Sequence, residues 1–320
     1  MNDLIIFNLQ EMYNFNRYKK DTWKAKAYND AIRLIKTIQI PIHSADDIQS
    51  LKLGKSIKEK VMYIIDHKTN IPQLSQETTQ TINNIHCINE LSNIHNIGIV
   101  KAKELVEEHG ITSFDNLLEN LHLLNMKQHQ GVQYHYEIQQ KIPRNEMNVH
   151  NEVIKTIVNE SFPDTKNFSL VGSYRRNKDE SGDIDLIIDA KTNFSMTDLV
   201  DVMISEGYIQ EDGIFALGKK KFMGMCKLPS HAISRRIDIL LTPSSEYAFA
   251  LLYFTGSKEF NVKMRERAKQ LGYRLNEKGL IDNTMTKIKG LKSEKDIFKF
   301  LKIKYVEPVQ RYIDNYEEYS

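Results

Sequence analysis

The chain has 320 residues, of which 41% are hydrophobic and 27% are charged, and its formal net charge is +2. This composition is ordinary for a globular protein, and it leaves room for two domains or several small ones. No apolar run approaches the ~18 residues of a membrane span, and the N-terminus lacks the basic region of a signal peptide, so we expect no membrane association. Two cysteines, Cys87 and Cys226, form neither a disulfide framework nor a metal-ligand spacing, which predicts an intracellular, reducing compartment.

The chain up to about residue 80 is predicted to be helical. Apolar residues recur at helical spacing over 25–39 and again over 56–67. Between residues 15 and 36, seven Lys and Arg stand against two acids, with Tyr18, Trp23 and Tyr28 among them. Such a pattern suits a phosphate-backbone partner, although a solvated helix face is the simpler interpretation of any single charge run.

A second helical block contains a turn motif. Residues 91–110 place a short polar turn and Gly98 before a helix that stops at Gly110. This pattern predicts a helix-hairpin-helix, in which a tight turn offers backbone groups to a phosphate and the next helix supplies its N-terminus and lysines. Residues 50–61 form a looser copy of the motif.

The character of the sequence changes near Asn148, where strands begin to alternate with helices. The predicted elements are a helix over 148–162, strands over 169–174 and 183–189, a helix over 197–207, and strands over 221–228 and 235–242. From Ser245 the chain mixes a helix over 258–272 with short loops and ends in the stretch 293–305. Residues 214–278 hold thirteen basic residues against five acidic ones, a second basic region.

Two acids within one predicted strand need an explanation. Asp183 and Asp185 stand two residues apart, so their side chains are expected on the same face, where like charges repel. A divalent metal would neutralise them, and Mg²⁺ prefers carboxylate oxygen together with water and phosphate. Asp238, in the predicted strand over 235–242, supplies a third carboxylate. Three carboxylates holding two metals ~3.5–4 Å apart form a clamp for in-line phosphoryl transfer.

The residues before the acid pair fit the same chemistry. Gly172 lets the backbone approach a phosphate, the Ser173 hydroxyl can donate to it, and Arg176 would meet the charge of the leaving group. Each part alone has a simpler interpretation: Asp183 as a turn residue, Arg175 or Arg176 as surface. The pattern gains weight from the Gly-Ser loop and the strand context together.

Several stretches in order carry a family resemblance. They are GSYRRNKDESGDID (172–185), KFMGMCKLPS (221–230), RRIDI (235–239), YFTGSKEFN (253–261) and SEKDIFKFLKIKY (293–305). In these the chain resembles the family X DNA polymerases, most closely the branch of DNA polymerase beta, over nearly its whole length. The resemblance implies an α+β protein: a helical N-terminal lyase domain with helix-hairpin-helix motifs, a nucleotidyltransferase palm with a mixed β-sheet, and a small α/β C-terminal domain. The implied boundaries are 1–80 for the lyase-like domain, 81–147 for the helix-hairpin-helix domain, 148–243 for the palm and 244–320 for nucleotide selection.

The resemblance also implies roles in the palm and the C-terminal domain. Asp183 and Asp185 would bridge both metals, and Asp238 would bind the catalytic metal and help deprotonate the primer 3′ hydroxyl. The residues implied to bind the incoming nucleotide are Gly172, Ser173, Arg176, Gly182, Tyr253, Phe254, Gly256 and Asn261. Arg236 and Arg265 would contact DNA, with Arg265 on the template strand. The backbone at Tyr253 would crowd a 2′ hydroxyl, and so deoxynucleotides should be preferred.

For the N-terminal half, the resemblance implies a 5′-deoxyribose-phosphate lyase. Lys60 would attack the abasic aldehyde and form a Schiff base before β-elimination. Lys24, Tyr28 and Lys55 would lie near the 5′ phosphate. The backbone carbonyls of the hairpin would bind DNA and a monovalent cation, Na⁺ or K⁺, and these carbonyls belong to Ser92, Ile94 and Ile97.

The chain departs from the family pattern at several positions. Ser56 stands where the family has a phosphate-binding lysine, and the first hairpin reads KLG in place of a G-x-G turn. Leu240, Lys258 and Lys278 replace an arginine, an acid and an aromatic residue near the nucleotide pocket. Fidelity therefore cannot be carried over from the family.

The sequence predicts a DNA-directed DNA polymerase that fills short gaps during base excision repair, with lyase activity at Lys60. Its cofactor would be two Mg²⁺ ions, with Mn²⁺ as a substitute. Its partners would be gapped or nicked double-stranded DNA, deoxynucleoside triphosphates, and a separate DNA ligase and AP endonuclease. We expect a monomer, in the nucleus of a cell or in the cytoplasm if the source is viral. The alternatives are a template-independent nucleotidyltransferase and a non-catalytic protein that binds gapped DNA.

Overall fold

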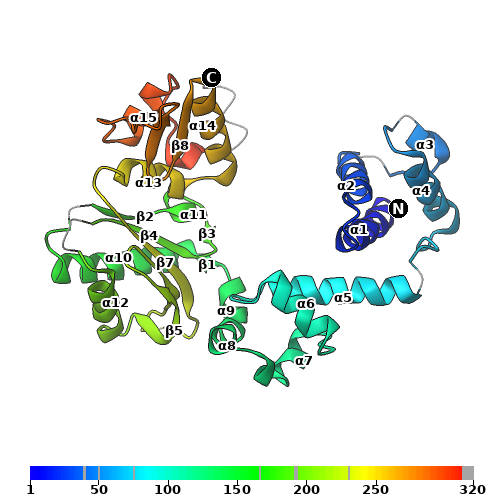
Figure 1. Ribbon diagram of the computed structural model, residues 1–320, viewed down its shortest axis with the longest axis horizontal. Helices are drawn as coiled ribbons and strands as arrows, with labels where there is room; N and C mark the ends of the chain where they lie inside the picture. The colour runs from blue at the N-terminus through cyan, green and yellow to red at the C-terminus, as the bar shows by residue number, and fades with distance from the viewer. Residues whose placement is uncertain are drawn as a thin grey trace. The chain divides into compact units, whose positions relative to one another are not determined.

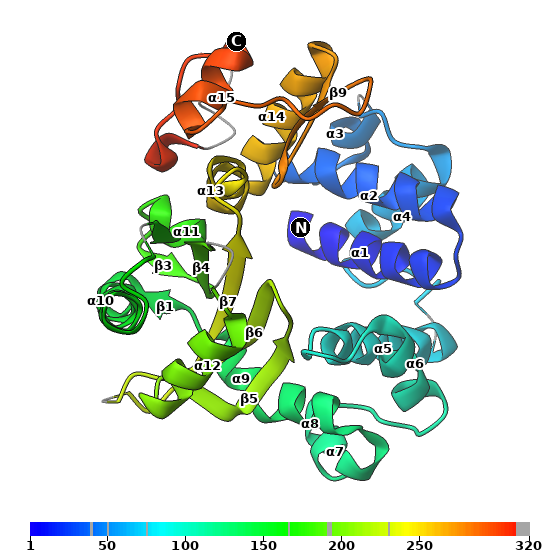
Figure 2. The same ribbon diagram turned by 60° about the vertical axis from the view of Figure 1, so that its left-hand side comes forward.

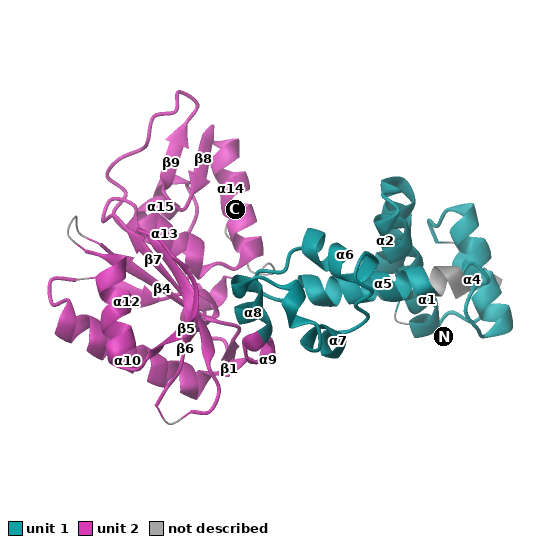
Figure 3. Ribbon diagram, turned by 60° about the horizontal axis from the view of Figure 1, so that its bottom comes forward, with its two compact units in different colours: residues 1–132 teal, residues 133–320 magenta. Residues whose placement is uncertain are grey.

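The computed structural model describes residues 1–38, 41–49, 51–74, 76–165, 167–190, 194–229 and 231–311. They form two compact units, residues 1–132 and 133–320, which Figure 3 distinguishes by colour. The predicted helix end at Gln39, the start of the looser hairpin at Ser50 and the last nine residues of the predicted C-terminal domain lie outside the described residues. No described helix combines the length and the apolar character needed to cross a membrane.

Unit 1 is helical throughout. Its first hydrophobic core lies among α1 (Asn2–Tyr18), α2 (Thr22–Lys36), α3 (Ala45–Gln49) and α4 (Lys55–His67). The prediction of a helix over 56–67 is confirmed by α4. Helix α2 begins earlier than predicted because the Asp21 side chain accepts a hydrogen bond from the backbone N–H of Lys24 at 3.1 Å and so caps the helix.

A second core in unit 1 surrounds the predicted helix-hairpin-helix. Helix α5 (Gln76–Ser92) and α6 (Ile99–Glu107) are joined by the short turn that ends at Gly98, as the sequence predicts. Three short helices complete this core: α7 (Phe114–Leu118), η1 (Leu121–Leu123) and α8 (Met126–Gln133). Cys87 is buried here and Cys226 is buried in unit 2, and both are free thiols.

Unit 2 is built on a five-stranded mixed sheet of order β2-β4-β7-β6-β5. Its strands are β2 (Phe168–Leu170), β4 (Ile184–Asp189), β5 (Ile209–Leu217), β6 (Lys221–Cys226) and β7 (Arg235–Thr242). Strands β4 and β7 run parallel, and the other neighbouring pairs are antiparallel. The α+β class and the mixed sheet are therefore as predicted.

Helices cover one face of this sheet. Helix α10 (Arg144–Ser161) and α12 (Met196–Ser205) contribute buried residues to one core with alternate residues of the central strands (Figure 2). Short elements border this layer: α9 (His135–Gln139), β1 (Ile142–Pro143) and β3 (Glu180–Ser181), with β1 pairing with β3.

The predicted strand over 169–174 is wrong in its second half. Strand β2 ends at Leu170, and α11 (Gly172–Arg175) follows. Gly172 has φ +58°, a left-handed conformation that ends the strand and that glycine adopts without strain. Asp183 likewise lies in a bend just before β4 and not within the strand.

The rest of unit 2 packs around a core of its own. It contains α13 (Tyr247–Thr255), α14 (Lys258–Gln270), the hairpin of β8 (Tyr273–Asn276) and β9 (Gly279–Asp282), α15 (Glu294–Phe300) and η2 (Pro308–Gln310). Helix α13 contacts β4 and α11, as Figure 1 shows. The sequence predicts α14, but it gives no indication of the β8–β9 hairpin or of β5.

Candidate active site

The parallel pairing of β4 and β7 sets two of the predicted carboxylates side by side. Asp185 and Asp238 are register partners across this pair. Their neighbours Ile184, Leu186 and Ile239 point into the core beneath α10 and α12. Because successive side chains of a strand alternate between faces, both acids lie on the face opposite that core.

Asp183, the third acid, interacts electrostatically with Asp185 and Asp238. Burial raises the pKa of Asp183, and the negative charge of Asp238 raises it further. Burial also raises the pKa of Asp185 to about 7, with the charges of Asp183 and Asp238 adding to the effect. Mutual repulsion of carboxylates in a desolvated place favours the protonated form, and a bound cation would relieve it.

Asp238 is held by cations of the protein. The Arg236 guanidinium lies 3.2 and 3.0 Å from its two carboxylate oxygens, and the Lys221 Nζ lies 3.8 Å from one of them. Among the residues that the structure describes, no group of three or more His, Cys, Asp and Glu side chains encloses a metal position. The structure thus sets Asp185 and Asp238 on one face with Asp183 coupled to them electrostatically, and Asp238 is turned to Arg236, which supplies part of the positive charge beside the cluster.

The loop before the acids packs directly on Asp185. A Cβ at Gly172 would overlap Oδ2 of Asp185, so only glycine fits here. The Ser173 hydroxyl lies 2.8 Å from the Ser181 hydroxyl, which joins the two ends of the loop. Gly182 completes it, and its Cβ position would lie 3.7 Å from the Lys141 Nζ. Glycine, hydroxyl and ammonium groups around a carboxylate pair suit a phosphate ligand.

Arg175, the last residue of α11, and Arg176, which follows it, reach toward the end of α13. Arg176 donates through Nη1 to the carbonyl of Thr255, and it lies beside Gly256. Arg175 donates to the Thr255 hydroxyl at 2.6 Å and to both carboxylate oxygens of Glu294 at 3.1 and 2.7 Å. The interpretation of Arg175 as a surface residue is therefore wrong, because a buried carboxylate binds it.

The predicted sugar and base contacts also come together. The Asn261 amide donates to the Tyr253 carbonyl at 2.6 Å, and the rings of Tyr253 and Phe254 pack edge to face with centroids 5.1 Å apart. Tyr253, Asn261 and Arg265 line one small cavity between α13 and α14. The structure joins these side chains in one place, next to the Gly256–Ser257 peptide, which is cis.

The lysines of unit 1 lie on exposed or half-buried helix surface. Lys60 on α4 donates from Nζ to the Ser56 hydroxyl at 2.8 Å, so the serine that replaces a lysine of the family pattern contacts the predicted nucleophile. Lys24 pairs with Asp21 at 3.0 Å. Tyr28 is buried, and it belongs to the same core as residues of α4.

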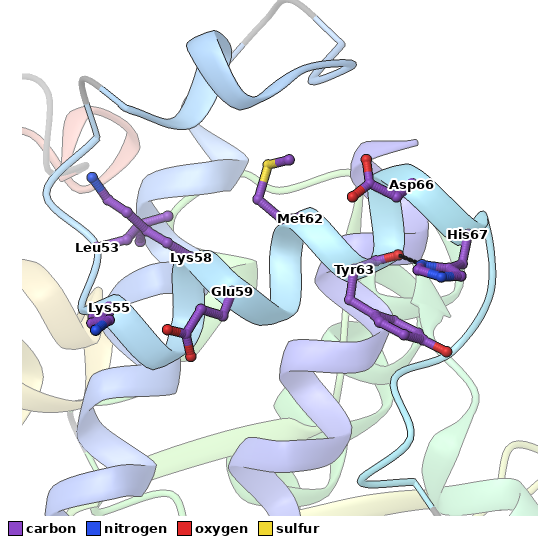
Figure 4. Close-up of a pocket in the computed structure, with 8 residues that line it drawn as sticks. All are labelled: Leu53, Lys55, Lys58, Glu59, Met62, Tyr63, Asp66 and His67. Carbon is purple, nitrogen blue, oxygen red and sulfur yellow. Dashed lines mark hydrogen bonds between the residues drawn. The ribbon is translucent and has the colours of Figure 1, made fainter.

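Lys55 begins α4 and lines an open pocket of about 700 Å³ that runs along this helix. Figure 4 shows Lys55, Lys58 and Glu59 at one end of this pocket and the stacked rings of Tyr63 and His67 at the other. Lys60 is not among the residues that line it. The pocket and the predicted nucleophile therefore use different sides of α4.

The helix-hairpin-helix turn is held in shape by a hydrogen bond of its own and by contacts with the segment 127–131. The Ile94 carbonyl accepts the N–H of Ile97 at 3.0 Å, which closes the turn. Asn96 has φ +64° and donates from its side chain to the Lys127 carbonyl at 3.0 Å. Gly131 of α8 lies against the His95 carbonyl, where a Cβ would overlap the oxygen. The carbonyls of Ser92, Ile94 and Ile97 thus lie in a turn of fixed shape.

Family models match most of the chain in consecutive stretches. The models described as the fingers domain of DNA polymerase lambda, the DNA polymerase beta palm and the DNA polymerase beta thumb match residues 89–139, 141–244 and 250–312. The chain belongs to family X of the DNA polymerases. All three predicted carboxylates and the loop at Gly172 fall within the palm match, and Tyr253, Asn261 and Arg265 fall within the thumb match.

Curated relatives agree with this membership. The chain is 29% identical over 312 residues to DNA polymerase lambda of Rattus norvegicus, a match that spans 91% of this chain and 53% of that protein. It is 27% identical over 325 residues to DNA polymerase lambda of Arabidopsis thaliana, which spans 94% of this chain and 60% of that protein. This family X chain therefore spans little more than half the length of these relatives.

Sequence reasoning missed several residues around the three carboxylates and the loop at Gly172. Lys141, Arg144 and Lys221 stand against the loop and the acids, and Glu294 ties Arg175 to α15. Arg144 lies 4.0 Å from the Tyr174 ring centroid and donates to the Tyr174 carbonyl, which fixes α11 on α10. Lys141 begins the stretch KIPRNEM (141–147), whose two basic residues just before the predicted helix over 148–162 were the available signal.

Proposed function

We propose that this chain is a template-directed DNA polymerase that fills short gaps in DNA during base excision repair. The observation that carries the proposal is the β4–β7 register, which sets Asp185 beside Asp238, with the loop at Gly172 packed against the Asp185 carboxylate. Family X membership supports the assignment, because nucleotidyl transfer needs such acids beside a phosphate-binding loop. The substrates proposed are gapped or nicked DNA and deoxynucleoside triphosphates.

The donor set fits divalent metal ions. Carboxylate oxygens are the ligands that Mg²⁺ and Mn²⁺ prefer, and the raised pKa of Asp185 together with the Arg236 contact to Asp238 indicates negative charge in need of a counterion. We propose that Asp183, Asp185 and Asp238 hold two such ions. When bound, they would lower the pKa of the primer 3′ hydroxyl and neutralise charge on the triphosphate.

The chain's own residues would then bind and orient the nucleotide. Gly172, Ser173, Gly182 and Arg176 would surround the phosphates. Tyr253 and Phe254 would lie against the sugar, where the Tyr253 backbone excludes a 2′ hydroxyl. Asn261 and Arg265 would contact the minor-groove edge of the base and the template strand, geometry that correct pairs share.

The test of polymerase function is extension across a one-nucleotide gap, with each deoxynucleotide supplied separately in Mg²⁺. Insertion of only the complementary nucleotide, lost in Asp183→Ala and kept in Asp179→Ala, is the expected result. Asp179 is a matched control because it is an exposed acid in the same loop. Addition of all four nucleotides without discrimination would favour a template-independent transferase. Tight gap binding with no extension would contradict catalysis altogether.

We propose in addition that Lys60 carries 5′-deoxyribose-phosphate lyase activity. Its amine would attack the C1′ aldehyde of the abasic sugar, water would leave as the Schiff base forms, and loss of a C2′ proton would break the bond to the 3′ oxygen. Borohydride reduction traps the Schiff base as a covalent adduct, whose position mass spectrometry locates. A wild-type chain that yields no adduct would remove the lyase proposal and leave the polymerase proposal intact. A DNA ligase and an AP endonuclease would supply the remaining repair steps.

A further inference from the structure

A second basic pocket lies in unit 1, away from the lysines of α4. It is formed by the end of α1, the middle of α5 and the start of α6, segments far apart in the sequence that lie side by side (Figure 2). Its volume is about 190 Å³. The residues that line it are Asn14, Arg17, Tyr18, Lys20, Ile85, Ile88, Asn89, Ile99 and Lys103. We refer to it as the α1–α5–α6 pocket.

The rim of this pocket is cationic. Arg17, Lys20 and Lys103 line it, and no ion pair holds any of these three among the residues that the structure describes. The Lys103 Nζ lies 4.8 Å from the centroid of the Tyr18 ring, a cation–π contact that keeps its charge at the pocket. Glu107 beside the wall keeps its negative charge while its carboxylate accepts the Tyr18 hydroxyl, but the three cations of the rim outnumber this one anion. The positive charge of the rim thus remains available to an anion.

The floor of the pocket is apolar and its sides carry amides. Ile85 and Ile88 are 6% and 2% exposed. Asn14 and Asn89 carry side-chain amides, which have both donors and acceptors, and the Asn14 Oδ1 also accepts from the Gln10 Nε2 at 3.2 Å. A liquid water occupies about 30 Å³, so the pocket holds the volume of roughly six waters, which suits a phosphate or a pyrimidine ring. Proteins bind single-stranded nucleic acid through cationic grooves with aromatic rings on which bases stack, and the pocket offers its cations beside the ring of Tyr18.

We propose that the α1–α5–α6 pocket binds one nucleotide unit. Arg17, Lys20 and Lys103 hold the phosphate, and the base or sugar lies on Ile85 and Ile88. Arg17 and Lys20 belong to the basic stretch 15–36 and Lys103 to the helix after the hairpin turn, and the pocket brings them together without Lys24, Tyr28 or Lys55. The shared chemistry, a phosphate joined to a heterocycle, comes either from a free nucleotide or from a strand.

Binding of the full chain to a fluorescein-labelled thymidine oligonucleotide tests the cationic rim. Fluorescence anisotropy is measured from about 50 to 200 mM salt for the double variant Arg17→Ala, Lys103→Ala. The control, Lys68→Ala with Lys127→Ala, removes the same charge from two exposed lysines of unit 1 that do not line the pocket. Each cation that no longer neutralises a phosphate of a single strand lowers the slope of log K against log salt by about 0.7, so the slope should fall by about 1.4 in the pocket variant alone. Equal slopes in the two variants would overturn the proposal.

A variant that fills the pocket tests its location without changing charge. Asn89→Trp places a large ring in the pocket, whereas Asn83→Trp places one elsewhere on the surface of α5. Asn89→Trp should weaken oligonucleotide binding about tenfold, and Asn83→Trp should leave it unchanged. Equal binding by these two proteins would contradict the proposal, whatever the charge variants do. Matching thermal melts confirm that each variant is folded.

Competition by thymidine monophosphate distinguishes the two sources of the nucleotide unit. Displacement of the oligonucleotide from wild type, but not from Asn89→Trp, assigns the pocket to free nucleotides. Retention of the oligonucleotide by wild type, with weaker binding by Asn89→Trp, assigns it to a strand. These measurements need no primer extension, so the inference stands or falls independently of the polymerase activity proposed above.

Discussion

The carboxylate site of unit 2 and the lysine site of unit 1 are built in different ways. Asp185 and Asp238 are fixed by the register of two buried strands, and Gly172 fits against one of them. Lys55, Lys58 and Lys60 stand on the surface of one helix, where Lys58 bonds the Gln49 carbonyl and Lys60 bonds Ser56. The first arrangement cannot shift without moving the sheet, whereas the second consists of flexible side chains.

This difference shows where residue identity is constrained. The register of a strand fixes the neighbours of each residue and the face on which its side chain lies, so no nearby side chain can substitute for it. Lysines on an exposed helix lie within reach of the same ligand, because a four-carbon side chain moves freely. We therefore expect large, specific effects from changes in the carboxylate site and smaller, shared effects from changes in the lysine site.

The largest effect is expected from Asp185→Asn, which preserves shape and removes charge. Metal-assisted stabilisation of transferred phosphoryl groups amounts to several kcal/mol, so primer extension should slow by about 1,000-fold or more. Single-turnover gap filling measures this rate, with Asp179→Asn as the control. A loss of less than tenfold would show that the register pair is not the catalytic centre.

A stability effect of similar size is expected beneath the same sheet. Arg235 bonds both carboxylate oxygens of Glu146 at 2.7 and 2.9 Å, and both residues are buried. Glu146→Ala strands a buried guanidinium and should lower the free energy of unfolding by about 3–5 kcal/mol, as measured in urea. Glu152→Ala breaks an exposed pair with Lys155 on the same helix and should leave it unchanged. If both changes lowered the free energy of unfolding equally, burial would not be the reason for the effect of Glu146→Ala.

A smaller effect should appear in the pH dependence of the metal-free protein. The pKa of Asp185 is raised to about 7 in the folded state from an ordinary value near 3.8. The folded protein therefore holds a proton that the unfolded chain releases, and stability falls as pH rises from about 4 to 7. Chelated wild type should lose about 1–3 kcal/mol across this range relative to Asp185→Asn.

Thermal melts at pH 5 and pH 8, with and without Mg²⁺, check this expectation. Mg²⁺ should restore the stability of wild type at pH 8 and have little effect on Asp185→Asn. Parallel pH profiles for the two proteins would show that Asp185 is ionised in the folded state without cost.

The smallest effect is expected in the lysine site. Lys60→Ala should reduce borohydride trapping on an abasic substrate by only about tenfold, because the side chains of Lys55 and Lys58, although they lie on another side of α4, are long enough to move and supply an amine. The adduct should then move to these lysines in mass spectrometry. Complete loss of trapping would show that no other lysine can replace Lys60. The lysine site would then be as constrained in residue identity as the carboxylate site.

The sequence was informative where one periodic signal dominated. Strands β4 and β7 follow from alternation of apolar residues with acids, and the three Asp residues followed from the same reading. Strand β5 was not predicted, since its pairing with β6 contains register shifts between Ile209 and Ala216 that interrupt alternation. The β8–β9 hairpin is four residues on each side and carries little pattern.

The parts of the site that sequence reasoning missed depend on distant partners. Arg175 binds Glu294, a residue more than a hundred positions away in the chain. Glu294 also accepts a hydrogen bond from Arg311 at 2.7 Å. Arg236 lies on the same strand as Asp238, yet its role as counterion depends on side-chain rotamers. No local pattern encodes such contacts, because they exist only once the elements have packed.

Because Gly131 packs against the His95 carbonyl, the shape of the hairpin turn depends on a residue outside the turn. The turn's own sequence, from Ser92 to Gly98, gives no sign that its back is filled by α8. Any side chain at position 131 would push against the His95 carbonyl and displace the turn from behind. Two chains with identical turns could therefore present different backbone surfaces, and grafting the motif into another protein would have to bring α8 with it.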